Sequence, residues 1–286
     1  MEEEKLLGKQ VGYPQSYCPE ILVSVPRCLN REIYGINNPG DLFYGYDSWH
    51  AYEASFITRA GLPVVGILKL VYPSTSEFLV ESKSLKLYLG SFNMTPQEGS
   101  DEFVAIIEKD LGRLLHTEVR GHFYNSVPAI QPFDFPDYTT LEGLPETGQI
   151  HFSAYQEHPE FLKENIIREP GEIRVCSHLL KSNCKITRQP DWGSIYIRLK
   201  AGHTPAPASL LKYIVSLRNE NHFHEEICEM TFKRLTDIFH PEILMVSCLY
   251  TRRGGIDICP VRANEKQHLP SGLPQSGILT RPGFRQ

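Results

Sequence analysis

Cys184 and Asp191 stand seven residues apart in the polar stretch SNCKITRQPDWGS, residues 182–194. A cysteine kept for packing usually lies in an apolar run, whereas Cys184 lies among polar residues. The cations nearby in the sequence are Lys181, Lys185 and Arg188. Cations favour the thiolate, which attacks an electrophilic carbon while a carboxyl group supplies the proton. We therefore take Cys184 as a candidate nucleophile with Asp191 as its proton partner, against the plainer alternative of a loop cysteine without a role.

The segment ESKSLKLY, residues 81–88, is a second candidate. Its serines, its lysines and the free N–H groups of a helix start would suit a phosphate group. A solvated, charged helix start is the commoner explanation for such a run. This segment alone therefore indicates an anion site only weakly.

The segment HFHEE, residues 222–226, places two histidines two positions apart. That spacing puts them on different faces of a helix, which disfavours a helical metal pair. The acidic residues suit a helix N-terminus, or a buried glutamate there would accept paired N–H donors from the edge of a heterocycle. Both interpretations stay open from these residues.

The segment YTRRGGIDICP, residues 250–260, joins two arginines to two glycines. It is either a simple turn at the end of a strand or a place where the backbone and guanidinium groups approach an anion. The chain holds no Gly-x-Gly-x-x-Gly motif, no Walker loop and no His-Glu-x-x-His motif, so a Rossmann-type dinucleotide site is not supported.

A weak internal repeat organises the chain. SLKLYLGSFN from Ser84 and SLLKYIVSLRN from Ser209 align at one offset, and repeats of this kind indicate related structural units. An amphipathic helix is predicted after each, within residues 100–119 and 223–243, from apolar residues at helical spacing. Ser100 is a candidate cap of the first of these helices, together with the adjacent Asp101.

Strand-like runs flank these helices in both halves. They are residues 62–73, 117–124, 193–200 and 242–253. The pattern predicts an α+β fold of two modules, each an antiparallel sheet with two helices on one face. We place the linker at 128–148 and the modules at 1–145 and 146–286. Because the halves keep different polar residues, we expect a composite site to which each half contributes.

The bulk properties exclude several classes of protein. The 286 residues carry a net charge of −5, which argues mildly against binding to nucleic acid or to an anionic membrane. Seven cysteines without a Cys-x-x-Cys pair argue against a disulfide framework or a zinc ribbon. Residues 1–10, MEEEKLLGKQ, show no secretory signal, and no apolar run is long enough to span a bilayer. We expect a soluble cytoplasmic protein.

Taken together, the four segments resemble one family, the NADPH-dependent 7-cyano-7-deazaguanine reductases or QueF family, over nearly the whole chain. The order of ESKSLKLY before the cysteine resembles the two-module subfamily. The resemblance implies a tandem of tunnelling-fold (T-fold) modules. Because a monomer of such modules would leave strand edges open, we also predict a symmetric homodimer. It also implies a nitrile reductase that converts 7-cyano-7-deazaguanine to 7-aminomethyl-7-deazaguanine in queuosine biosynthesis, a tRNA modification. The implied partner is this small molecule, not nucleic acid or a membrane.

The resemblance also implies a role for each site residue. Cys184 attacks the nitrile carbon to give a thioimide, and Asp191 donates the proton. The implied substrate-binding residues are Val80, Glu81, Ser82, His224 and Glu225. The implied residues for the cofactor, NADPH, are Ser82, Lys83, Arg253 and Gly254. No metal is implied.

Two rival functions remain at this stage. One is a zinc-dependent pterin or GTP cyclohydrolase-like hydrolase of the same fold, with Cys184, His178 and His224 as ligands, although their spacing fits no ligand pattern. The other is a non-catalytic purine-binding or tRNA-handling module. The acidic balance and the lack of interleaved basic and aromatic residues argue against RNA binding.

Overall fold

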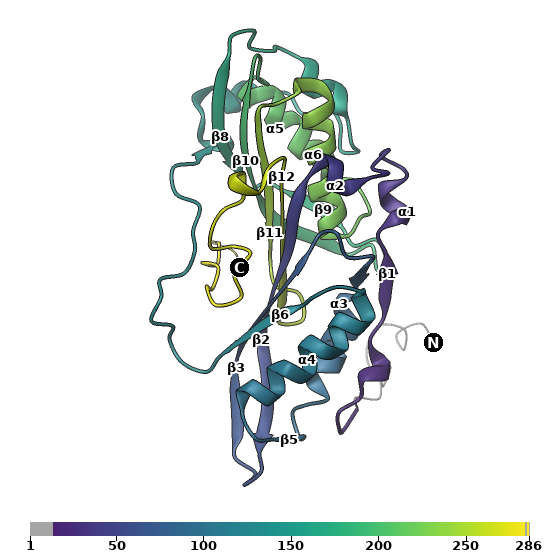
Figure 1. Cartoon of the computed structure of the whole chain (residues 1–286). Helices are drawn as coiled ribbons and strands as arrows, with labels where there is room; N and C mark the ends of the chain where they lie inside the picture. Colours follow the sequence, from purple (N-terminus) through teal and green to yellow (C-terminus); the bar gives the residue numbers. More distant parts are fainter. Residues whose placement is uncertain (1–13, 284, 286) are drawn as a thin grey trace, which may run out of the picture.

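One long sheet runs through the computed structural model, which describes residues 14–283 and 285 (Figure 1). The segment 1–10, predicted to carry no secretory signal, lies outside the described residues. The α-helices are α1 (Cys28–Arg31), α2 (Pro39–Leu42), α3 (Ser82–Gly90), α4 (Ser100–Leu115), α5 (Pro207–Ser216) and α6 (His224–Phe239). The strands are β1 (Ser24–Pro26), β2 (Tyr44–Thr58), β3 (Pro63–Pro73), β4 (Phe78–Val80), β5 (Pro96–Gln97), β6 (Arg120–Tyr124), β7 (Thr139–Thr140), β8 (Gly171–Ser177), β9 (Lys181–Asn183), β10 (Pro190–Ala201), β11 (Ile243–Tyr250) and β12 (Ile256–Ala263). The fold is α+β, as predicted.

The main sheet has ten strands, eight of which follow the order β6-β3-β2-β12-β11-β10-β8-β7. Strand β5 pairs with β2, and β9 pairs with β10. All pairings in this sheet are antiparallel except β2–β5 and β7–β8. The pairing of β2 with β12 joins strands from the two ends of the chain, with Ile258 opposite Trp49. The sheet therefore continues without a break from the N-terminal to the C-terminal half.

Two pairs of helices cover one face of this sheet, α3 with α4 and α5 with α6 (Figure 1). The apolar stripe predicted within 100–119 is buried at Phe103, Leu111 and Leu115, and the stripe predicted within 223–243 is buried at Ile227 and Leu235. Burial of large apolar side chains is the main favourable term in folding. The helical spacing of these residues thus explains why each helix lies against the sheet.

The opposite face of the sheet is covered by the C-terminal segment, residues 264–283. Ser48 Oγ donates to the Leu273 carbonyl at 2.8 Å, and Lys69 Nζ donates to the Ile278 carbonyl at 2.6 Å. Because side chains alternate along a strand, residues on β12 face either the helices or this segment. The candidate site and a buried polar cluster that includes Asp257 and Cys259 of β12 therefore lie on different faces of the sheet.

A buried ion network ties the N-terminal segment to α6. Arg31 and Arg262 both contact Glu229 Oε1 at 2.7 Å. Arg262 also contacts Asp47 at 2.8 Å, and Arg27 pairs with the same carboxylate. Opposite charges and hydrogen bonds offset the cost of burying these groups. The network fixes the position of α6 against β2 and β12.

Two sequence-based expectations differ from the structure, and one long strand was missed. Gly99 stands at the N-cap of α4 without a side-chain cap, so the predicted capping by Ser100 or Asp101 is wrong. The helix predicted to 119 ends at Leu115 because His116 adopts a left-handed backbone with φ 54°. The fifteen-residue strand β2 was not predicted. Among the described residues, no helix combines the length and apolar character needed to cross a bilayer.

Candidate active site

A pocket with a free volume of about 30 Å³ lies where α3, α6 and the β9–β10 hairpin meet. Its walls come from both halves of the chain, as expected for a composite site. They are formed by Trp49, Val80, Glu81, Ser82, Cys184, Asp191, His222, Phe223, His224, Glu225, Arg253, Ile256 and Ile258. A space of this size holds one or two water molecules. Side chains must therefore move before a purine-sized ligand can enter.

The β9–β10 hairpin brings Cys184 and Asp191 to this pocket. Ser182 pairs with Asp191 in the register of the two strands, and the Cys184 N–H donates to the Gln189 carbonyl at 2.9 Å. Arg188 closes the turn with φ 56°. A short hairpin of this kind holds both side chains on a rigid scaffold.

The thiol of Cys184 is half-buried, and its pKa is lowered. Burial acts to raise the pKa, but hydrogen bonds from Thr187, Ile186 and Arg253 outweigh that effect. We expected nearby lysines to stabilise the Cys184 thiolate, but both contact other groups. Lys185 forms an ion pair with Glu226 at 2.9 Å, and Lys181 donates a hydrogen bond to Asn183 at 2.7 Å. The cation that acts on the thiol is Arg253, which the sequence placed 69 residues away.

Asp191 is buried and is contacted by two side chains, those of Arg253 and His224. Arg253 Nη1 lies 2.6 Å from Asp191 Oδ1, and His224 Nε2 lies 3.3 Å from Oδ2. Burial acts to raise the pKa of this carboxyl, but His224 and Arg253 lower it further than burial raises it. The carboxylate is therefore ionised in this structure, ready to accept a proton before it can donate one.

Two residues of the first turn of α6 line the pocket and carry unsatisfied polar atoms. In the described part of the chain, His224 Nδ1 and Glu225 Oε1 are buried without a hydrogen-bond partner. Buried polar groups are nearly always paired, so both atoms are candidates for contact with a ligand. Burial and the charge of Asp47 raise the pKa of Glu225 to about 8. The ring of His224 stacks on that of Tyr250, with the ring centroids 3.9 Å apart.

Glu81 lies at the pocket but also caps α3. Its carboxylate accepts hydrogen bonds from the N–H groups of Lys83 at 3.0 Å and Ser84 at 2.7 Å. We expected these N–H groups to be free to bind a phosphate, and this part of the prediction is wrong. An ionised carboxylate still has lone pairs to spare for a ligand.

Of the predicted site residues, Lys83 and Gly254 do not line this pocket. Lys83 is exposed, and Gly254 lines a neighbouring cavity instead. The pocket adds His222, whose only predicted role was in a disfavoured metal pair. Burial acts to lower its pKa, but Glu220 and Glu226 raise it to about 9. In the sequence, Glu220 lies two positions before His222 and Glu226 four positions after it. This spacing was the signal that His222 pairs with carboxylates.

The residues considered for zinc do not gather. His178 bonds to Ser194 at 2.8 Å and lies outside the pocket. Within the described ranges, the one group of three potential ligands that lies within 4.8 Å is His50, Asp257 and Cys259.

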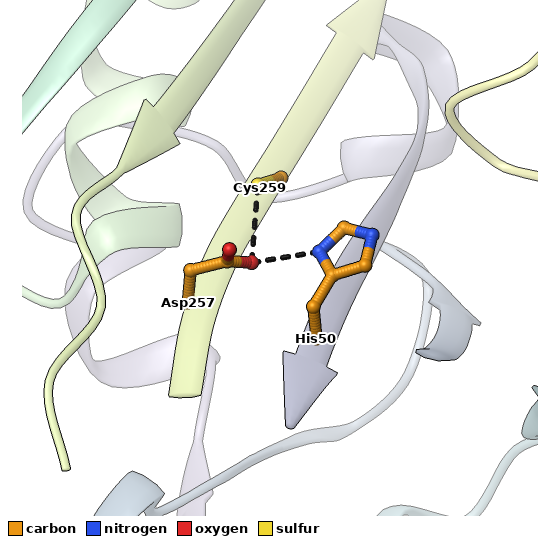
Figure 2. Close-up of side chains that lie close together, drawn as sticks. All are labelled: His50, Asp257 and Cys259. Atoms are coloured by element: carbon orange, nitrogen blue, oxygen red, sulfur yellow. Dashed lines mark hydrogen bonds and ion pairs between the residues drawn. The ribbon is translucent and has the colours of Figure 1, made fainter. Parts of the chain in front are cut away.

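Figure 2 shows this buried cluster on adjacent strands. Asp257 accepts from His50 at 2.7 Å, from Tyr52 at 2.8 Å and from Cys259 at 3.6 Å. Ile256 and Ile258 line the pocket, and Asp257 and Cys259 alternate with them along β12. The cluster therefore lies on the opposite face of the sheet and takes no part in the site.

Two family models match the chain. A model described as "Nitrile reductase, 7-cyano-7-deazaguanine-reductase N-term" matches residues 13–123, and one described as "QueF-like protein" matches residues 190–269. An NADPH-dependent 7-cyano-7-deazaguanine reductase of Acinetobacter baumannii (strain SDF) is 37% identical over 273 residues, which cover 95% of this chain and 97% of the relative. The chain belongs to this reductase family.

A second member of the NADPH-dependent 7-cyano-7-deazaguanine reductases, from Rickettsia bellii (strain OSU 85-389), is 39% identical over 96% of this chain and 97% of its own length. A solved structure, that of the archaeosine synthase QueF-Like in the apo form, has a TM-score of 0.30 at 15% identity. It covers 34% of this chain and 95% of that one, and this likeness is too low to carry an argument.

Proposed function

We propose that this chain reduces the nitrile of 7-cyano-7-deazaguanine to a primary amine with NADPH, giving 7-aminomethyl-7-deazaguanine for the queuosine modification of tRNA. The chain's membership of the reductase family supports the reaction class. One observation carries the assignment of the site. A thiol of lowered pKa, an ionised carboxylate and two unsatisfied polar atoms line the same pocket.

Cys184 is the proposed nucleophile and Asp191 the proton carrier. As the sulfur bonds to the nitrile carbon, one carbon–nitrogen π bond breaks and the thiol proton must reach the nitrogen. Asp191 is ionised here, so it can take the proton from the thiol and then pass it to the nitrogen. The product of this step is a thioimide with a reducible carbon–nitrogen double bond.

The unsatisfied atoms of α6 are proposed to hold the deazaguanine ring. Glu225 Oε1 can accept an N–H of the pyrimidine edge, and His224 Nδ1 can bond to a polar atom of the ring. Val80, Glu81 and Ser82 complete this binding surface from the α3 side. A nucleobase that forms hydrogen bonds with these two buried atoms should bind more tightly than a ligand that lacks matching polar groups.

Residues for NADPH are proposed at Ser82, Lys83, Arg253 and Gly254. The donor set fits the group, since two cations and a glycine with φ 60° let the backbone approach a phosphate. Two NADPH molecules, bound one after the other, would each supply one hydride. The carbon–sulfur bond breaks between the two hydride deliveries and returns the Cys184 thiolate, and two protons complete the amine. Arg252, Arg253 and Lys83 favour a 2′-phosphate, so kcat/KM for NADPH should clearly exceed that for NADH.

We further propose tandem T-fold modules, 1–145 and 146–286, in a cytoplasmic homodimer. The two helix pairs on one sheet face support the tandem arrangement. The sheet ends at β6 and β7, and exposed strand edges favour pairing with another chain. Light scattering should show a dimer, and an active monomer at the assay concentration would contradict this proposal.

Oxidation of NADPH with and without the nitrile tests the function directly. We expect absorbance at the NADPH wavelength to fall only when 7-cyano-7-deazaguanine is present, with two NADPH consumed for each amine formed. Oxidation that is independent of the nitrile would overturn the proposal. Metal analysis of the pure protein addresses the zinc hydrolase, and stoichiometric zinc required for turnover would favour that rival.

A further inference from the structure

The buried cluster on the opposite face of the sheet combines three kinds of side chain that bind metals. His50 comes from β2, and Asp257 and Cys259 come from β12 (Figure 2). Their side chains are buried, and one potential ligand atom from each lies within 4.8 Å of the other two. The proposed reduction of the nitrile uses none of these residues. Imidazole, carboxylate and thiolate are the usual protein ligands of zinc.

Two of these groups converge on a single oxygen of Asp257. His50 Nδ1 lies 2.7 Å and Cys259 Sγ 3.6 Å from Asp257 Oδ1. The other oxygen, Oδ2, accepts a hydrogen bond from Tyr52 at 2.8 Å, which fixes the orientation of the carboxylate. One ion in place of the two protons would therefore contact nitrogen, oxygen and sulfur at once.

The distances within the cluster are close to those of a tetrahedral site. Around zinc, an oxygen and a sulfur ligand lie about 3.5 Å apart, and an oxygen and a nitrogen ligand about 3.3 Å apart. The sulfur–oxygen distance of 3.6 Å already fits, whereas the nitrogen–oxygen distance must open by about 0.6 Å. In the part of the chain that the structure describes, His50 Nε2 is buried without a hydrogen-bond partner. A shift of the ring thus breaks no second hydrogen bond.

The ligand set selects among the common divalent ions. A thiolate favours zinc over magnesium and calcium, which prefer oxygen ligands. The negative charges of the thiolate and the carboxylate balance the charge of the ion. The nearby cation, Lys69, lies opposite His50 in the pairing of β2 with β3 and donates to the Ile278 carbonyl at 2.6 Å. Its ammonium group therefore has a partner in the C-terminal segment.

We propose that His50, Asp257 and Cys259 form a zinc site that ties β2 to β12. Water fills the fourth position in sites with three protein ligands, and the thiol proton leaves to solvent when the ion binds. The Tyr52 N–H donates to the Gly255 carbonyl at 2.9 Å, so the site lies next to the turn between β11 and β12. This inference goes beyond the proposed function and does not depend on it, because the cluster and Cys184 lie on opposite faces of the sheet.

Titration of the chelator-treated, metal-free protein with Co²⁺ tests the site. Co²⁺ takes the place of Zn²⁺, and its bond to a thiolate gives a charge-transfer band in the near ultraviolet. We expect the band to saturate at one Co²⁺ per chain and to disappear when Zn²⁺ is added. Cys259→Ser should abolish the band, and Asp257→Asn and His50→Gln should weaken Co²⁺ binding by at least tenfold. Cys28→Ser, at an exposed cysteine, is the matched control and should keep the band.

Thermal unfolding gives a second readout that does not depend on the probe ion. Zn²⁺ at a hundredfold excess over its dissociation constant should raise the unfolding midpoint of the wild type by about 5 °C. The same addition should leave the midpoint of Cys259→Ser unchanged.

Three results would overturn the inference. The first is a wild type without a charge-transfer band at one equivalent of Co²⁺, which would show that the cluster is only a hydrogen-bonded network. The second is a band that persists in Cys259→Ser, which would place the ion at another thiol. If Cys259→Ser does not fold by circular dichroism, unchanged Co²⁺ affinity in Asp257→Asn and His50→Gln decides against the site. The third is loss of nitrile-dependent NADPH oxidation when the ion is removed from protein that stays folded, which would give the ion a part in the reaction.

Discussion

Arg253 Nη1 donates a hydrogen bond to Asp191 Oδ1 at 2.6 Å. Its Nη2 donates to Thr187 at 2.9 Å and to Gln189 at 2.7 Å, both in the turn that carries Cys184. The arginine assigned to the cofactor by family resemblance therefore holds the nucleophile turn and the proton carrier in this structure. A cofactor phosphate that draws Arg253 away would release Asp191 at the same time.

Arg253→Met should change two measurable properties. The pKa of Cys184 is lowered partly by Arg253, so its loss should move the acid limb of thioimide formation, followed without NADPH, to higher pH. Cofactor binding should also weaken by about 1.5–3 kcal/mol, the range for a charged hydrogen bond. Arg59→Met, at an exposed pair with Glu98, is the control, and an unshifted pH profile in Arg253→Met would argue against this role.

Asp191→Asn keeps the thiol but removes the proton carrier. We expect adduct formation to slow by about 10²–10⁴, the usual contribution of general acid–base catalysis. Stopped-flow absorbance or quenched mass spectrometry measures this rate. Asp237→Asn, on the exposed pair with Lys233, should react at the wild-type rate. An Asp191→Asn variant that forms the adduct as fast as the wild type would show that the proton travels by another route.

Strong local patterns explain which parts of the molecule could be predicted. Helices α4 and α6 have long apolar stripes, and the hairpin of Cys184 and Asp191 is local in the chain. Strand β2 was missed because the buried polar residues Asp47, Ser48 and His50 interrupt its apolar alternation, and its pairing with β3 is irregular between Ala51 and Ala54.

Long-range contacts explain what the sequence could not reveal. Arg253 reaches Asp191 across 62 residues, and only the folded sheet places that turn beside the β9–β10 hairpin. Glu81 likewise accepts from the helix N–H groups that we expected to bind a phosphate. Lys185, which we expected to act on the Cys184 thiol, pairs with Glu226 instead. Residue type and spacing thus indicated the site, while the partner of each charge depended on tertiary structure.

His222 should make the stability of the protein depend on pH. Its pKa is raised from 6.5 to about 9 by Glu220 and Glu226, with Tyr34 Oη also within 3.3 Å. A raised folded-state pKa adds stability that is fully present below pH 6.5 and lost as the pH rises through 9. Urea unfolding should show the wild type losing stability relative to His222→Gln over this interval. Parallel pH dependence in the two proteins would contradict the assignment.

Glu229 should be important for stability because it pairs with buried arginines. Glu229→Gln leaves Arg31 and Arg262 short of a carboxylate in a buried network, and breaking such a pair costs about 3–5 kcal/mol of unfolding free energy. Glu242→Gln removes an exposed partner of Lys200 and should cost less than about 1 kcal/mol. Similar urea midpoints for the two variants would show that the network contributes no more than a surface pair.

Trapping of the covalent adduct tests the central claim, that Cys184 is the nucleophile. Mixing the protein with 7-cyano-7-deazaguanine and no NADPH should add one substrate mass per chain by intact-mass spectrometry, and peptide mapping should place it on Cys184. Cys184→Ala should show neither adduct nor turnover, yet bind the nucleobase through His224 and Glu225. The buried thiols of Cys176 and Cys228 are internal controls. An adduct on either of them, or full activity in Cys184→Ala, would contradict the account.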